Sequence, residues 1–118
     1  MTRVSFLRDS GGTLLGYTAK GHSGFSEQGS DIVCAAVSAL TQSCAKGIMN
    51  VVGARARYKL DSKGYFEIFI QDGQSEDKLS KCQVLLETLY ETLTELSQDE
   101  RYRNNVRVTI TERRSKHV

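Results

Sequence analysis

Several features that would assign this chain to a particular class are missing from its 118 residues. It has only three cysteines, Cys34, Cys44 and Cys82, with no CxxC pair and no nearby histidine at metal-ligand spacing. Neither a disulfide framework nor a zinc site is therefore favoured. Reduced thiols fit a reducing compartment, so we expect a cytoplasmic protein that requires no metal and no cofactor.

The sequence also shows little sign of a membrane or of a leader. Residues 1–8 alternate and then turn polar, so they lack the continuous apolar core of a secretory signal. We find no segment of the length needed to cross a bilayer, and we expect no membrane association. The length favours one domain over residues 1–118.

Net charge is small as well, at +2. Residues 99–118 hold six Lys or Arg against three Asp or Glu, so the excess of positive charge lies at the C-terminal end. A basic edge of this kind is usually a solvated face. The composition therefore disfavours direct nucleic-acid binding.

The first half of the chain predicts a hairpin followed by a long helix. Residues 4–8 and 14–19 have strand character and are separated by a turn signal at 9–13. Residues 31–50 contain no proline, follow the possible caps Ser30 and Asp31, and end near Gly47 and Gly53. Small residues should let this helix pack closely on a sheet and be largely buried: Ala35, Ala36, Ser38, Ala39, Ser43 and Ala45.

The second half predicts another hairpin, from residues 55–60 and 65–70, then a helix over 76–97 and a last strand over 106–111. Apolar residues of the helix recur every three or four positions, which suits a coiled-coil seam but more often a helix packed on a sheet. The order β-β-α-β-β-α-β predicts an α+β fold, with both helices on one mainly antiparallel five-stranded sheet.

The chemistry centres on Cys34. If Asp31 caps the long helix, Cys34 is at N3, where the helix dipole favours negative charge and hence the reactive thiolate. His22, in a glycine-rich loop twelve residues upstream, is the natural base and later the general acid. From these residues alone, a buried structural cysteine is the more common interpretation.

Neighbouring residues have alternative roles. Asp31 orients His22 or only caps the helix, and cap preferences favour the second. Ser38 lies one turn after Cys34, where it hydrogen-bonds the catalytic groups or packs against the sheet. The N–H groups of Cys34 and Gly21 are candidate oxyanion donors, although no sequence signal shows this role.

The Gly21-His22 pair, the eleven-residue gap and the segment Asp-Ile-Val-Cys-Ala-Ala-Val-Ser over residues 31–38 closely resemble the bacterial ribosomal-processing cysteine protease family. The resemblance implies a homodimeric Cys-His endopeptidase that removes a short N-terminal extension from large-subunit ribosomal protein number twenty-seven. It also implies that His22 and Cys34 are the catalytic dyad, with supporting roles for Gly21, Asp31 and Ser38.

The same resemblance implies that residues 23–30 form a mobile lid over an extended substrate with an aromatic residue before the cut. Gly24 and Gly29 are hinges of this lid or ordinary turn glycines. Phe25 contacts the substrate or staples the loop to the core. Ser23, where relatives often carry alanine, and Ser30 complete the predicted substrate loop.

Two other classes of function remain open. One is a non-catalytic domain that binds ribosomal RNA or a ribosomal protein through Arg55, Arg57, Lys59 and the basic C-terminal segment, because alternating cations on a strand can follow phosphates. The other is a purely structural dimer formed through the leucine stripe of the second helix.

Overall fold

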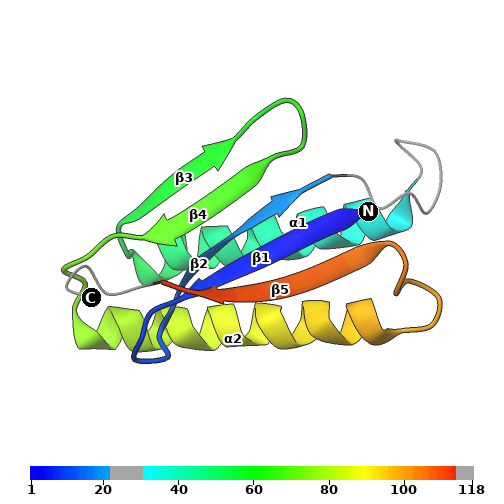
Figure 1. The fold of residues 1–118 in the computed structure, drawn as a ribbon. Helices are drawn as coiled ribbons and strands as arrows, with labels where there is room; N and C mark the ends of the chain where they lie inside the picture. Colours follow the sequence, from blue (N-terminus) through cyan, green and yellow to red (C-terminus); the bar gives the residue numbers. More distant parts are fainter. Residues whose placement is uncertain (22–30, 114–118) are drawn as a thin grey trace.

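One five-stranded sheet with helices on one of its faces makes up the part of the chain that the computed structural model describes, residues 1–21 and 31–113 (Figure 1). The strands are β1 (Thr2–Arg8), β2 (Leu14–Lys20), β3 (Ala56–Leu60), β4 (Phe66–Ile70) and β5 (Val106–Glu112). The helices are α1 (Ile32–Lys46), which continues as the π-helical segment η1 (Gly47–Val52), and α2 (Glu76–Gln98). The predicted α+β class and element order are confirmed.

The strands are ordered β3-β4-β2-β1-β5 across the sheet. Three of the four neighbouring pairs are antiparallel, and only β1 and β5 run parallel, with Val4 opposite Val108. A parallel neighbour needs a long connection, which the chain provides through the elements between β1 and β5. The expectation of a mainly antiparallel sheet is therefore confirmed.

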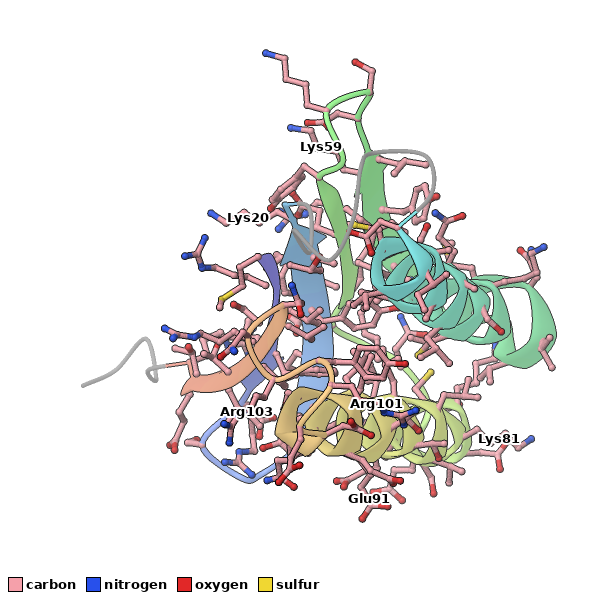
Figure 2. The ribbon with its side chains drawn as sticks, turned by 90° about the vertical axis from the view of Figure 1, so that its right-hand side faces the viewer. Lys20, Lys59, Lys81, Glu91, Arg101 and Arg103 are labelled. Atoms are coloured by element: carbon pink, nitrogen blue, oxygen red, sulfur yellow. The ribbon has the colours of Figure 1, made fainter. Side chains whose placement is uncertain are left out.

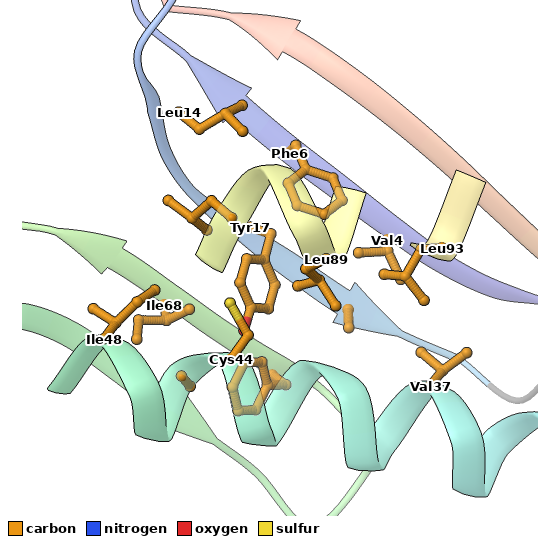
Figure 3. Close-up of a cluster of buried hydrophobic side chains, with 14 of the residues drawn as sticks. Val4, Phe6, Leu14, Tyr17, Val37, Cys44, Ile48, Ile68, Leu89 and Leu93 are labelled. Atoms are coloured by element: carbon orange, nitrogen blue, oxygen red, sulfur yellow. The ribbon is translucent and has the colours of Figure 1, made fainter. Parts of the chain in front are cut away.

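The core lies between the helices and the inner face of the sheet (Figure 3). Phe6 and Tyr17 are buried side by side, with ring centroids 5.5 Å apart. Tyr90 from α2 forms a T-shaped pair with Phe6, with ring centroids 5.2 Å apart. The buried stripe of α2 consists of Cys82, Leu86, Leu89 and Leu93. These side chains belong to the core cluster, so the stripe packs on the sheet rather than forming a coiled-coil seam.

The expectation that α1 is largely buried through its small residues is wrong. Its buried side carries Val33, Val37, Thr41, Cys44 and Ala45. The exposed side carries most of the small residues, namely Ala35, Ala36, Ser38, Ala39 and Ser43. A helix that lies on one face of a sheet beside a second helix buries only one stripe, and the larger side chains supply it.

Close helix packing instead occurs at Gly47, where α1 gives way to η1. A Cβ atom at this position would lie 2.9 Å from a methyl carbon of Leu85 on α2. The helical path ends at Gly53, whose φ of +77° places it in the left-handed region, and its N–H donates to the carbonyl of Ile48. The lack of a side chain at Gly47 therefore allows the two helices to approach each other closely.

The expectation that no segment is long enough to cross a bilayer is also wrong. Residues Ile32–Val52 form a helical segment of 21 residues that is long and apolar enough to do so. Length and composition alone are weak evidence for a span, because a helix packed on the core of a protein passes the same test. Here the buried stripe of that segment is in contact with the sheet.

Candidate active site

Cys34 lies in the first turn of α1, and Asp31 caps that turn. One carboxylate oxygen of Asp31 accepts the N–H of Val33 at 2.9 Å and the N–H of Cys34 at 3.1 Å. The Asp31 carboxyl is nearly enclosed, with 6% of the residue exposed. The capping role is confirmed, and Cys34 occupies N3, where the unpaired N–H groups of the helix concentrate positive potential.

The thiol of Cys34 faces a cavity of about 190 Å³ between α1 and the sheet. Its polar wall includes Thr2, Ser38 and Gln42, and its apolar wall includes Leu60 and Phe66. Strand β1, helix α1 and the β3–β4 hairpin therefore all contribute to one site. Cys34 itself is partly exposed and is one of the residues that line the cavity.

Thr2 is a site residue that sequence reasoning missed. Its hydroxyl lies 3.9 Å from the sulfur of Cys34, within hydrogen-bonding distance for sulfur. Thr2 is only 4% exposed, and its N–H donates to the carbonyl of Asn105 at 2.8 Å. A threonine at a strand start has no sequence signal that links it to a cysteine 32 residues away. Only the packing of β1 against α1 brings the two together.

Ser38 and Gln42 extend the line of Cys34 along α1. The Gln42 side-chain amide donates to the Ser38 hydroxyl at 2.8 Å, and both residues line the cavity. Ser38 is exposed, so the alternative that it packs against the sheet is wrong. Gln42 was missed, although its spacing of four residues from Ser38 and eight from Cys34 places all three on one helical face.

The other two cysteines are core residues, as expected. Burial raises the pKa of Cys44 to about 11 and also raises the pKa of Cys82. The Cys44 thiol donates to the carbonyl of Leu85 at 3.6 Å. Both groups therefore stay protonated near neutral pH, and neither lines the cavity of Cys34. Among the described residues, no three His, Cys, Asp or Glu side chains are grouped to hold a metal.

Gly21 brings the chain to the wall of this cavity directly before His22. Its φ is +89°, and a Cβ atom there would lie 2.5 Å from the carbonyl oxygen of Met1. Glycine is therefore required both by the backbone conformation and by the close approach of β1.

Six of the predicted site residues lie outside the described part of the chain: His22, Ser23, Gly24, Phe25, Gly29 and Ser30. The described part still bears on the oxyanion prediction. Because the N–H of Cys34 already donates to Asp31, an oxyanion would have to compete with a carboxylate for it.

A partly exposed cysteine at N3 of a helix, lining a cavity together with hydroxyl and amide residues, is the arrangement expected of a cysteine hydrolase. The family model described as cysteine protease Prp matches residues 1–107. The chain belongs to that family and is a cysteine protease.

Individual relatives agree with this assignment. The chain is 26% identical over 110 residues to the ribosomal processing cysteine protease Prp of Bacillus subtilis, covering 92% of this chain and 96% of that protein. It matches the crystal structure of the essential ribosomal processing protease Prp from S. aureus, in complex with a covalently linked product peptide, with a TM-score of 0.81 and 26% identity. The match covers 94% of this chain and all of that one. A Streptococcus mutans structure matches with a TM-score of 0.78 and 28% identity, covering 96% of each chain.

Proposed function

We propose that Cys34 is the nucleophile of this protease and that His22 is its base. The observation that carries the proposal is the position of Cys34, which is partly exposed at N3 of α1 and lines a cavity. Cys44 and Cys82 are buried elsewhere. Gly21 lines the same cavity, which supports its immediate neighbour His22 as the proton acceptor.

The reaction follows from these two groups. The Cys34 sulfur forms a bond to the scissile carbonyl carbon while His22 holds the thiol proton. The C–N bond then breaks, and His22 gives the proton to the leaving amine. In the second half, His22 takes a proton from water, which attacks the acyl-enzyme and releases the new carboxyl group and the thiol.

The remaining cavity residues suggest how a peptide is held. The Gln42 amide has two N–H groups, one of which donates to Ser38, and the other is a candidate donor to the backbone of a peptide in the cavity. Leu60 and Phe66 offer an apolar wall for the aromatic residue that the family resemblance implies before the cut. Gly21 to Ser30 remains the predicted course of the substrate and its lid.

The substrate class comes from the relatives. Two of them are named as ribosomal processing proteases, and one carries a covalently linked product peptide. We therefore propose that this chain removes a short N-terminal extension from large-subunit ribosomal protein number twenty-seven. This function places the enzyme in ribosome maturation.

Mass spectrometry of the extended ribosomal protein after incubation with enzyme tests the proposal. We expect one cut by the wild-type chain and none by Cys34→Ala, while the matched thiol control Cys82→Ala still cuts. His22→Asn should lower turnover by about 100-fold or more, the usual contribution of a positioned base. Cleavage by a folded Cys34→Ala variant, or an intact substrate with folded wild-type enzyme, would contradict the proposal.

We also propose a cytoplasmic homodimer, as the resemblance implies. A hollow of about 680 Å³ between η1 and α2 is lined by Val51 and Val84, which are 81% and 66% exposed, among other residues that include Lys46 and Lys81. The two exposed valines suit burial against a second copy. Light scattering after size exclusion should show a dimer that Val51→Asp and Val84→Asp weaken and that exposed Thr92→Asp does not. A wild-type monomer at all concentrations would contradict this proposal.

A further inference from the structure

The sheet face opposite the helices gathers positive charge from the whole chain. In Figure 2, Lys20 and Lys59 project from the side of the sheet away from α1, whereas Glu91 projects from α2. Alternation along the strands places five exposed cations on this outer face: Arg3, Lys20, Arg57, Lys59 and Arg107. Exposed Arg113, directly after β5, lines a hollow together with Arg57 and Phe69 of this face. Among the described strand residues of this face, the acidic one is Glu67, which Arg57 meets at 3.5 Å.

Strand register brings three of these cations into one row. Arg3 on β1 is opposite Lys20 on β2 and also opposite Arg107 on β5. Like charges on directly opposite residues destabilise a sheet. An anionic partner would offset that repulsion, so the row points to a ligand rather than to folding stability.

A hollow of about 510 Å³ lies on the same face, near the other end of β1. Leu7, Leu15 and Phe69 give it apolar surface, and Arg57 and Arg113 line it with positive charge. The Arg57 guanidinium lies 5.6 Å from the centre of the Phe69 ring. Asp72 also lines the hollow. An aromatic ring beside two arginines suits a flat base attached to phosphate.

Hydroxyl groups lie between the row and the hollow. Ser5 and Thr109 are hydrogen-bonded to each other at 2.9 Å on this face. From Arg3 to Leu7 the strand advances about 13 Å, so the three features follow one another along β1. Hydroxyls that can donate and accept are suited to a ribose 2′-OH.

We propose that this outer sheet face binds single-stranded RNA, with phosphates along the cationic row and a base stacked on Phe69. The proposal goes beyond the protease function and does not depend on it. It revises the sequence expectation, which rested on the small net charge of +2 and on reading the basic C-terminal end as a solvated face. That charge is polarised, because α2 carries five Asp or Glu against two Lys.

The site also differs from the RNA-binding alternative that the sequence suggested. Arg55 precedes β3, and its guanidinium donates to the carbonyls of Asp72 and Gly73 at 3.2 and 3.3 Å. It therefore ties two loops together instead of facing a ligand. Arg3, Lys20 and Arg107 replace it, and they are distant from one another in the sequence.

Fluorescence anisotropy with a short labelled oligouridine RNA tests this proposal on the full chain. We expect Arg107→Ala with Arg113→Ala to weaken binding at least about tenfold and to reduce the salt slope by about 1.4 between about 50 and 200 mM salt. The matched control, Lys78→Ala with Arg101→Ala in and directly after α2, removes the same charge away from this face and from the proposed dimer hollow. It should change affinity less than about twofold. Phe69→Leu should weaken binding about tenfold with the salt slope unchanged, because it removes stacking but no charge.

Thermal melting of each variant confirms that it is folded before its binding is interpreted. Equal losses in the two double variants would overturn the proposal, because they would show diffuse attraction to the whole protein. Equal binding of a poly-glutamate peptide, or tighter binding of single-stranded DNA than of RNA, would also overturn it.

Discussion

The hydroxyl of Thr2 lies 3.9 Å from the sulfur of Cys34, which joins the first strand to the first turn of α1. Thr2 is buried and its backbone N–H donates to Asn105, so its side chain has a defined position. We interpret it as a positioning residue that limits the directions in which the thiol can point.

Removing this hydroxyl should slow catalysis without weakening substrate binding. Thr2→Val keeps the shape of the side chain, and we expect kcat to fall about tenfold with KM nearly unchanged, since one modest hydrogen bond is lost. Thr2→Ser should restore most of the rate. Steady-state kinetics measure both values, with Thr109→Val on the outer sheet face as the matched control. An unchanged kcat in Thr2→Val would show that the contact has no role in positioning.

Because Asp31 caps α1, two substitutions of it should differ in their effect on stability. Asp31→Ala removes the acceptor of two backbone N–H groups and should lower the free energy of unfolding by about 1 kcal/mol. Asp31→Asn can still cap, so we expect it to keep most of the stability and most of the activity. Urea unfolding and peptide cleavage measure the two. Full stability with lost activity in Asp31→Asn would instead favour a direct role toward His22.

Gly21 and Gly12 allow a comparison of how much an added side chain lowers the free energy of unfolding at each position. Both have φ near +90°, but a Cβ at 21 would meet the Met1 carbonyl oxygen at 2.5 Å, whereas at 12 nothing lies within 4 Å. Gly12→Ala should cost about 1 to 2 kcal/mol from backbone strain alone, and Gly21→Ala should cost more. Chemical denaturation compares them. Equal losses would mean that β1 yields to the added methyl group.

The free energy of unfolding should fall in alkaline solution because the Cys44 thiol and the Tyr17 hydroxyl are buried in their protonated forms. Burial raises the pKa of Cys44 to about 11, above the value of about 8.5 for a free thiol. The unfolded chain therefore releases this proton first, and the stabilisation is complete below about pH 8.5 and is lost as the pH rises to about 11. Burial also raises the pKa of Tyr17, which acts in the same direction above about pH 10.

Denaturation curves between pH 8 and 11 measure this dependence. We expect Cys44→Ala to be less stable at neutral pH but to have a weaker alkaline loss, since one titrating group is gone. The exposed neighbour Ser43→Ala should keep the wild-type dependence. A free energy of unfolding that is constant over this range would contradict the assignment.

Family membership changes the weight of the alternatives that the sequence left open. The chain belongs to a cysteine protease family, so the non-catalytic domain and the purely structural dimer no longer explain it. The RNA-binding idea survives in another form, because the outer sheet face is separate from the thiol cavity apart from its member Lys20. The proposed RNA-binding face and the proposed protease site are therefore compatible with each other on one chain.

Local patterns were sufficient for the elements and for the centre of the site. Strand alternation and the leucine stripe of α2 produced bounds within two residues of those observed for the strands and for α2. The cap at Asp31 and the N3 position of Cys34 followed from residue preferences, because capping involves neighbours in sequence. The buried side of α1 did not follow from residue preferences, because helix propensity does not depend on which side of the helix packs on the sheet.

The sequence by itself thus determined the order of the elements, the capped helix that carries Cys34, and the helical line from Cys34 to Ser38. Each of these depends on contacts within a few residues. Only the tertiary structure decided that Thr2 touches the thiol, that Leu60 and Phe66 form the apolar wall, and that Arg3, Lys20 and Arg107 share one row. These relationships depend on strand register and on helix packing, which join residues far apart in the chain.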